Sequence, residues 1–468
     1  MVFSGEQPRP HIAIIPSAGM GHLTPSCRLA TTLAAQGCHV SLIVFHPMVS
    51  SAESKSMTNF FSSFPSIHPI HFNVVPLPGS GDPFFLQFEA IRQSPHLLLP
   101  LLTSSSSPPI TSIIVDISLA STFLPAISPT GISTFIFFTA SASMLALCAY
   151  FPTHIDIDQN KRSKDHVDVP GVGVIPMASI PPRLHNPSDL FTTQFVANGR
   201  ALMQANGVLI NTFEALEPET LTAFNNGVVL PGFPPVMAVG PVKQLPLMET
   251  SAALPWLDAQ MERSVVYVSF GSRTGMSVEQ IRELGVGLER SGAKFLWVIK
   301  TKMVDKEEAQ VELKELLGEE LVERIKEIGS MVVHGWVEQE EILKHGAVGG
   351  FVSHCGWNSV MEAALHGVPV LAWPQIGDQK VNAEVVRRSG LGIWVEEWSW
   401  GGQEGKVVKG EEIAERVKEL MDSPVVCSSA ARVAAEAVKA VGDGGSSEKS
   451  LAEFIAKLEG VKYMGLIN

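Results

Sequence analysis

The feature of this sequence that most constrains the fold is an alternation of short apolar segments with helical patterns, which occurs twice along the chain. The two series lie on either side of a proline-containing stretch without clear periodicity, residues 241–254. The segments expected to be buried strands are His11–Ile15, Val40–Phe45, Ile110–Val115, Thr134–Phe138, Val208–Asn211, Val265–Phe270, Phe295–Ile299, Val348–Ser353 and Val368–Trp373. Buried strands that alternate with helices are typical of parallel sheets covered by helices. The sequence therefore predicts an α/β protein with two doubly wound, Rossmann-like domains that face each other across a cleft.

The stretch between the two series gives the expected domain boundaries. We place an N-terminal domain at residues 1–242, a linker at 243–254 and a C-terminal domain at 255–468. A helix is expected over Pro25–Gln36, after the first strand. The last helical segment, near Ser450–Leu458, can pack on either domain.

The charge balance narrows the classes of partner. The chain has 34 Lys and Arg against 47 Asp and Glu, a formal net charge of −13. Nucleic acids and anionic membranes attract basic surfaces, so neither is an expected partner. An anionic ligand must instead be held by local donors such as helix N-termini. The five cysteines have no CxxC spacing, and the N-terminus lacks the layout of a signal peptide, so we expect a cytoplasmic protein. The acidic surface is compatible with a monomer, which is the expected oligomeric state.

One long segment has no charged residue. From Ile117 to Thr153 there is no Asp, Glu, Lys or Arg, and its length would allow a membrane span. Pro125, Pro129 and many Ser and Thr residues favour a buried strand and helix instead. We therefore expect no membrane insertion.

Two glycines and a histidine follow the first predicted strand, in the run SAGMGHLTP at residues 17–25. Gly19 and Gly21 permit close approach of the backbone, and the turn delivers His22 to the sheet edge where ligands of open α/β sheets bind. His22 is a candidate catalytic base, and the alternative is a structural loop histidine. A dinucleotide fingerprint is a competing interpretation of the turn, although Thr24 stands where its third glycine is expected.

Asp116 ends another predicted strand and should reach the same sheet edge. If that strand neighbours the first, Asp116 can accept a hydrogen bond from one nitrogen of His22, which leaves the other nitrogen as a base. The alternative is that Asp116 only caps the following helix.

The most informative segment runs from Trp336 to Gln379. The predicted strand Val348–Ser353 leads into the run HCGWNS at residues 354–359, where Gly356 permits close approach of the backbone to a ligand. The N–H groups of the helix start and the His354 imidazole suit a diphosphate. Further along, Glu362 can accept from ribose hydroxyls, Asp378 and Gln379 can bind hydroxyls, and Trp336 can stack on a base. Ordinary packing or capping explains any one of these residues, but it explains the set poorly.

Two metal-based alternatives are weak. His345, His354 and Cys355 do not have the spacing of a zinc site. The pair Asp156 and Asp158 resembles a metal–nucleotide clamp, but a solvated loop explains it as well. We expect no metal.

The segment resembles the signature of plant family-1 UDP-glycosyltransferases. Trp336, Gln339, His345, the HCGWNS run, Glu362, the run Gly367–Pro369 and the closing Asp378–Gln379 are in register, and Glu338 departs from the proline common in the family. The runs SFGS at 269–272 and NTFE at 211–214 extend the resemblance over nearly the whole chain. It implies a GT-B fold and inverting, metal-independent transfer from a UDP-sugar, with the closing glutamine as in glucose-preferring members.

The resemblance also implies roles for individual residues. Trp336 would stack on uracil, the backbone of Val337 would bind the edge of the base, and Gln339 and Glu362 would hold the ribose. The diphosphate would be bound by Ser272, His354, Asn358 and Ser359, and the sugar by Thr139, Trp357, Asp378 and Gln379.

Segments of the N-terminal half resemble the C-glycosyltransferase branch that acts on 2-hydroxyflavanones and phloretin-like phenols. Residues 82–90, 138–153 and 190–200 carry this resemblance, as does the pair Asp116–Ile117. Because the aspartate of many O-glycosylating relatives sits about one position later, the branch implies a looser pairing between His22 and Asp116. Aromatic side chains expected to line the acceptor side are Phe84, Phe85, Phe88 and Phe195.

The sequence thus predicts a UDP-glucose-dependent, inverting C-glucosyltransferase with His22 as base. The main alternative is a phenol O-glucosyltransferase that uses the same donor site. A nicotinamide-dependent enzyme and a nucleotide-sugar binder without catalysis are the other classes left open.

Overall fold

The computed structural model describes residues 9–77, 83–104, 108–157, 163–242, 253–271, 276–299, 312–335, 337–398 and 407–461. The chain divides into two compact units. The first comprises 1–178, 182–245 and 439–468, and the second comprises 179–181 and 246–438. Of the predicted linker, residues 243–252 lie outside the described residues, and helix α9 (Ala253–Asp258) begins at its end.

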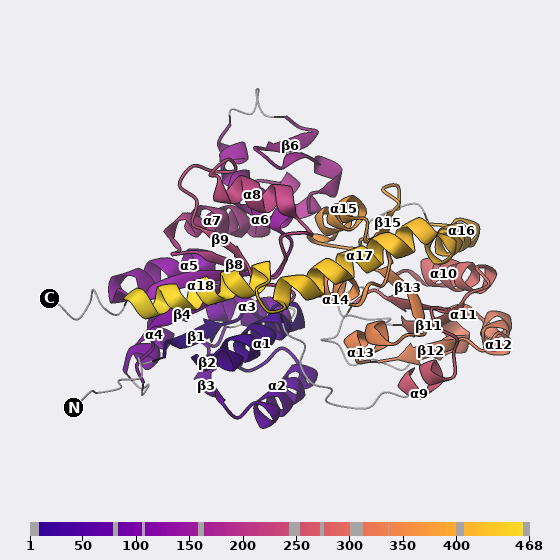
Figure 1. Ribbon diagram of the computed structural model, residues 1–468, viewed down its shortest axis with the longest axis horizontal. Helices are drawn as coiled ribbons and strands as arrows, with labels where there is room; N and C mark the ends of the chain where they lie inside the picture. The colour runs from indigo at the N-terminus through magenta and orange to yellow at the C-terminus, as the bar shows by residue number, and fades with distance from the viewer. Residues whose placement is uncertain are drawn as a thin grey trace. The chain divides into compact units, whose positions relative to one another are not determined.

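The first unit is built on a parallel sheet with the strand order β3-β2-β1-β4-β5-β8-β9 (Figure 1). Its strands are β1 (His11–Ile15), β2 (His39–His46), β3 (Ile67–Asn73), β4 (Ser112–Asp116), β5 (Ser133–Phe138), β8 (Val208–Ile210) and β9 (Val236–Ala238). A separate antiparallel pair is formed by β6 (His166–Val169) and β7 (Gly173–Pro176). The predicted α/β class is confirmed, and the predicted strands of this half begin and end within two residues of the observed ones. Sequence patterning missed β3, which has Pro69 and a mostly exposed burial pattern and lies at the sheet edge.

Helices connect these strands. They are α1 (Met20–Ala35), α2 (Ser51–Ser63), α3 (Pro83–Arg92), α4 (Pro95–Ser104), α5 (Ala120–Ile127), α6 (Ala142–Asp156), α7 (Leu190–Ala201), α8 (Pro218–Asn225) and α18 (Ser446–Val461), with short 3-10 turns at η1 (Ile117–Leu119), η2 (Ser128–Thr130), η3 (Met177–Ser179), η4 (Pro182–His185) and η5 (Leu202–Gln204). The prediction for α1 was wrong at its start, because the helix begins at Met20 and contains Pro25 in its second turn. As the sixth helical residue, Pro25 has no N–H to donate to the carbonyl four residues earlier, so the helix lacks one backbone hydrogen bond at this position. His22 therefore lies in the first turn of a helix and not in a loop.

One large buried cluster of the first unit lies on one face of this sheet. Alternate residues of the strands, such as Ile12 and Ile14 of β1, pack with side chains of α1 and α2 in one buried cluster. The last helix, α18, packs on the same face (Figure 1). It contributes Leu451, Phe454 and Leu458 to the cluster, and the Phe454 ring meets that of Phe135 edge-on at 4.9 Å.

The uncharged segment forms α5, β5 and most of α6, which are largely buried within the first unit. No helix in the described ranges combines the length and the apolar character that crossing a bilayer requires.

A buried carboxylate fixes the loop between β5 and α6. Glu217 accepts hydrogen bonds from the backbone N–H groups of Ala142 (2.8 Å) and Ser143 (2.9 Å) and from the hydroxyl of Thr212 (2.9 Å). Burial raises the pKa of Glu217, and these donors oppose that shift. Since the bonded N–H groups open α6, the carboxylate is an N-cap supplied from another part of the chain.

We expect Glu217→Ala to lower the free energy of unfolding by about 3 kcal/mol, because two buried N–H groups lose a charged acceptor. Glu214→Ala is the matched control, since Glu214 is exposed in the same connection, and it should change stability little. Chemical denaturation of the three proteins measures this difference. Equal stability of the two variants would contradict the assignment of Glu217 as a cap.

The second unit is built on another parallel sheet, with the strand order β12-β11-β10-β13-β14-β15. Its strands are β10 (Val265–Ser269), β11 (Lys294–Ile299), β12 (Met331–His334), β13 (Val348–Ser353), β14 (Val370–Ala372) and β15 (Gly392–Trp394). Its helices are α9, α10 (Val278–Arg290), α11 (Leu313–Leu317), α12 (Glu319–Glu327), α13 (Gln339–Lys344), α14 (Trp357–His366), α15 (Gln379–Ser389), α16 (Gly410–Asp422) and α17 (Pro424–Val441), whose last residues count with the first unit. The short strands β12 and β15 were not predicted.

Candidate active site

Two side chains of the first unit form a buried dyad. β1 and β4 are parallel neighbours with Ile15 opposite Val115, so the turn that follows β1 lies beside the end of β4. Nδ1 of His22 is 2.8 Å from Oδ2 of Asp116. The Asp116 side chain is fully buried, whereas 32% of the His22 side chain is exposed. The predicted contact between these residues is confirmed.

The expectation of a loose pairing is wrong. Asp116 is the last residue of β4, directly beside the first turn of α1, and 2.8 Å is an ordinary distance for a charge-assisted hydrogen bond. The other oxygen, Oδ1, accepts from the N–H of Ser118 at 2.9 Å and so caps η1. Both interpretations of Asp116 therefore hold, one for each oxygen.

Thr139 also lies against the dyad. Its hydroxyl is 3.2 Å from Nδ1 of His22, at the end of β5, which pairs with β4. The hydroxyl is a secondary partner, because the carboxylate is closer and charged. With Nδ1–H directed at Asp116, Nε2 is the ring nitrogen that can take up a proton.

The turn between β13 and α14 has an unusual backbone. Cys355 is fully buried and has a φ of 62°, a region that costs a non-glycine residue about 1–2 kcal/mol. Its N–H donates to Oγ of Ser353 at 3.1 Å, and its carbonyl accepts from Nδ2 of Asn382 at 3.1 Å. Burial raises the pKa of the Cys355 thiol well above its usual range, so the thiol stays protonated. Such strain marks sites where the surrounding structure imposes a required shape.

Two glycines make room for the His354 imidazole. A Cβ atom on Gly271 or on Gly356 would lie 2.5 Å from Nε2 of His354, closer than atoms pack. Gly356 was expected to allow a ligand to approach the backbone. The structure shows that the ring of His354, two residues earlier, occupies the space beside Gly356. His354 is therefore half-buried beside two glycines at the start of α14, whose first residues include Asn358.

A hydrogen-bonded group joins α13 to α14. Nε2 of Gln339 donates to Oγ of Ser359 at 2.9 Å and to Oε2 of Glu362 at 2.8 Å. Ser359 and Glu362 are 6% and 7% exposed. The predicted ribose-binding pair, Gln339 and Glu362, is thus in direct contact.

The loop after β14 orients two of the four predicted sugar-binding residues, Asp378 and Gln379. Oε1 of Gln379 accepts from the N–H groups of Gln375 (2.7 Å) and Ile376 (2.8 Å), so its amide nitrogen is the end left to donate. Oδ2 of Asp378 accepts from Asn382 at 2.8 Å. Asn382 thus bonds both this loop and the Cys355 turn.

The structure says less about the remaining residues that were predicted to bind the UDP-sugar. Trp336 and Ser272 lie outside the described residues. The indole of Trp357 is 3% exposed, which leaves little of it for contact with a sugar. Val337 is buried, and its carbonyl accepts the N–H of Gln339 at 2.9 Å.

The four phenylalanines predicted for the acceptor side form two clusters. On α3, Phe84 contacts both Phe85 and Phe88, and the rings of Phe84 and Phe88 are parallel at 6.3 Å. Phe195 of α7 packs on Phe151 of α6.

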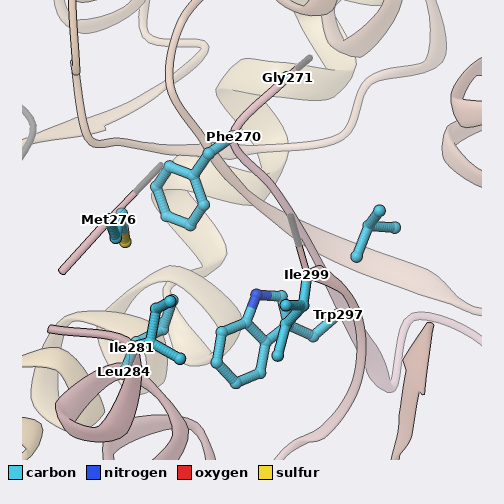
Figure 2. A pocket seen from close by; sticks show the side chains of 8 residues that line it. Phe270, Gly271, Met276, Ile281, Leu284, Trp297 and Ile299 are labelled. Carbon is cyan, nitrogen blue, oxygen red and sulfur yellow. The ribbon is translucent and has the colours of Figure 1, made fainter. Parts of the chain in front are cut away.

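A small apolar pocket lies at the carboxyl ends of β10 and β11 (Figure 2). Phe270, Met276, Leu284 and Trp297 line it beside Gly271, and its volume is about 20 Å³. An apolar cavity of this size cannot hold a diphosphate or a nucleotide.

The metal-based alternatives find no support in the described residues. In those ranges no three His, Cys, Asp or Glu side chains gather as a metal site. Asp156 forms a two-point ion pair with Arg200, at 2.8 and 2.9 Å, and Asp158 lies outside the described residues.

Three further residues support the site and were missed: Ser118, Asn198 and Glu217. The spacing of Asp116 and Ser118 is a capping pattern that could have revealed the first. All but one of the side-chain hydrogen bonds described for Asn198 and Glu217 join residues 74 or more positions apart, so no local pattern indicates them.

Comparison with known proteins agrees with this geometry. A family model described as UDP-glucoronosyl and UDP-glucosyl transferase matches residues 231–423. The chain is 51% identical to a protein of Oryza sativa subsp. japonica named UDP-glycosyltransferase CGT, over 97% of each chain. It is 34% identical to an anthocyanidin 5,3-O-glucosyltransferase of a Rosa hybrid cultivar, over 94% of this chain and 97% of that one. The crystal structure of LpCGTa in complex with UDP is 46% identical and superimposes with a TM-score of 0.86, covering 96% of this chain and 99% of LpCGTa. The chain is therefore a member of the UDP-glycosyltransferase family and has the GT-B fold.

Proposed function

We propose that this enzyme is an inverting C-glucosyltransferase, which attaches glucose from UDP-glucose to a ring carbon of phloretin-type or 2-hydroxyflavanone polyphenols. The observation that carries the chemistry is the dyad of His22 and Asp116, a partly exposed imidazole oriented by a buried carboxylate. Such a pair is suited to remove a proton from a hydroxyl. Nothing in the arrangement calls for a metal.

Support for the C–C linkage comes from the relatives. The chain is 51% identical to a protein named CGT and 46% identical to LpCGTa, abbreviations that we take to mean C-glycosyltransferase. Its identity to the O-glucosyltransferase is lower, at 34%. The close pairing of His22 and Asp116 does not distinguish the two linkages, because either reaction begins with loss of a phenolic proton.

In the proposed reaction, Nε2 of His22 takes the proton of a phenolic hydroxyl, and Asp116 stabilises the imidazolium through Nδ1–H. The phenolate directs electron density to its ortho carbon, which attacks the anomeric carbon from the face opposite UDP. The new C–C bond forms as the C–O bond to UDP breaks, and UDP leaves with the electron pair. The ring carbon then loses its proton to water, and His22 returns a proton to the phenolate oxygen. One UDP and one proton are released for each β-C-glucoside formed.

The second unit would hold the donor. We assign the ribose to Gln339 and Glu362, the diphosphate to His354, Asn358, Ser359 and Ser272, and the uracil to Trp336 and the Val337 backbone. The first turn of α14 presents N–H groups to the charge that develops on the leaving group. Asp378 and Gln379 would bind sugar hydroxyls, the latter through its amide nitrogen, with Thr139 and Trp357 near the sugar. Phe84, Phe85, Phe88 and Phe195 would contact the acceptor.

The test is incubation with UDP-glucose and phloretin, followed by treatment of the product with hot acid. We expect a glucoside that survives, because a C–C bond has no acid-labile acetal. A product that releases glucose would instead support the O-glucosyltransferase. Binding of UDP without any product would support a nucleotide-sugar binder and contradict the proposal.

A further inference from the structure

We infer that Asn198 is a positioning residue for the catalytic dyad: it fixes the turn from which Asp116 holds His22. This inference rests on the proposed function. Asn198 lies on α7 and is 7% exposed. Its side chain bonds the backbone of Ser121 and Ser118 and neither member of the dyad, so its action passes through the intervening turn.

The side chain of Asn198 makes a two-point contact with the backbone around η1. Its Oδ1 accepts from the N–H of Ser121 at 2.9 Å, and its Nδ2 donates to the carbonyl of Ser118 at 3.0 Å. A carboxamide is the side-chain group that offers one acceptor and one donor in this spacing. Asn198 therefore clamps both sides of the turn that begins at Asp116.

The turn η1 also fixes the carboxylate of Asp116. Oδ1 of Asp116 accepts from both the N–H and the hydroxyl of Ser118, while Oδ2 bonds His22. If Ser118 moves, the carboxylate must rotate or lose a bond, and the distance to Nδ1 changes. The chain of contacts from Asn198 to His22 is continuous and consists of hydrogen bonds between 2.5 and 3.0 Å.

Contacts at both ends of α7 fix the helix in place, so Asn198 acts from a fixed position. Asp189 caps its start by accepting the N–H of Phe191 at 2.8 Å. Next to Asn198, a Cβ on Gly199 would lie 2.2 Å from the carbonyl oxygen of Cys148, so the glycine allows α7 to approach α6 closely. The neighbouring pair Asn198–Gly199 thus links α7 both to α6 and to the turn η1 that follows Asp116.

The test compares Asn198→Ala with Asn206→Ala. Asn206 is a matched control because its Oδ1 also accepts a backbone N–H, that of Thr134 at 2.7 Å, at the opposite end of β5 from Thr139. For Asn198→Ala we expect kcat to fall about 10-fold or more, since small displacements of catalytic groups are costly. The KM values for donor and acceptor should change by less than about twofold. The acid limb of the pH profile of kcat/KM should move to lower pH, because the imidazolium loses its oriented carboxylate.

A second variant covers the event that Asn198→Ala does not fold. Asn198→Asp has the same size and keeps the acceptor for Ser121, but it cannot donate to the carbonyl of Ser118, so a fall in kcat is again expected. A measurement without turnover is the proton resonance of His22 Nδ1–H, assigned by its absence in His22→Gln. It should broaden or shift in both Asn198 variants and not in Asn206→Ala. Unchanged resonance, kcat and pH profile in a folded Asn198 variant would overturn the inference, whereas a wild-type enzyme that forms no glucoside would overturn the proposed function.

Discussion

Replacement of His22 by alanine is expected to slow glucosyl transfer by at least about 10²-fold, because no other side chain of the dyad can accept the phenolic proton. Asp116 contacts Nδ1 of His22 and supplies one oxygen to η1, so it is committed to orienting the ring. The variant should bind UDP as tightly as the wild type, since the proposed donor residues other than Thr139 belong to the second unit.

Initial rates with saturating UDP-glucose and phloretin, together with calorimetric titration of UDP, measure both parts of this prediction. His68→Ala is the control, because His68 is exposed on β3 and is not part of the dyad. Full activity of His22→Ala would remove this residue as the base. A parallel loss of UDP binding would place His22 in the donor site instead.

Gly356→Ala should weaken binding of UDP by about 10-fold or more, which corresponds to about 1.4 kcal/mol. The backbone of Gly356 has a φ of −57°, which alanine adopts without strain, so the effect comes from space alone. The added methyl group would lie 2.5 Å from Nε2 of His354 and must displace the ring. The imidazole would then leave the position from which we expect it to bind the diphosphate.

Gly346→Ala is a matched control for this substitution. Gly346 lies in the same segment, and no atom lies within 4 Å of the position of an added Cβ. Calorimetry with UDP should give the same affinity for this variant as for the wild type. If Gly356→Ala also binds UDP normally, His354 is not a diphosphate ligand.

Much of the fold could be predicted because its strands are continuous apolar runs. β1 and β13 were predicted with their observed bounds, since both are buried along their whole length. β3 and β15 were missed because they are edge strands and partly exposed, which gives them no comparable run. The start of α1 was misplaced because the glycine-rich run before it conceals a helix that begins at Met20.

The contact between His22 and Asp116 was predictable because His22 follows β1 and Asp116 ends β4, and both strands end at one sheet edge. The exact position of the carboxylate was not, because the pairing depends on where β4 ends and on the turn that follows it. The bonds of Glu217 and Asn198 join residues far apart in sequence, and only the folded chain shows them. The same holds for the close approach of Gly271, which lies in another loop of the second unit, to the ring of His354.

The most direct test of the proposed reaction is to identify the bond that joins the sugar to the acceptor. The enzyme is incubated with phloretin and UDP-glucose carrying carbon-13 at the anomeric position, and the product is examined by carbon-13 and proton-correlated NMR. We expect a one-bond carbon–carbon connection between the anomeric carbon and a ring carbon, with the ring proton at that position lost. An anomeric carbon bonded to a phenolic oxygen, with every ring proton retained, would contradict the account.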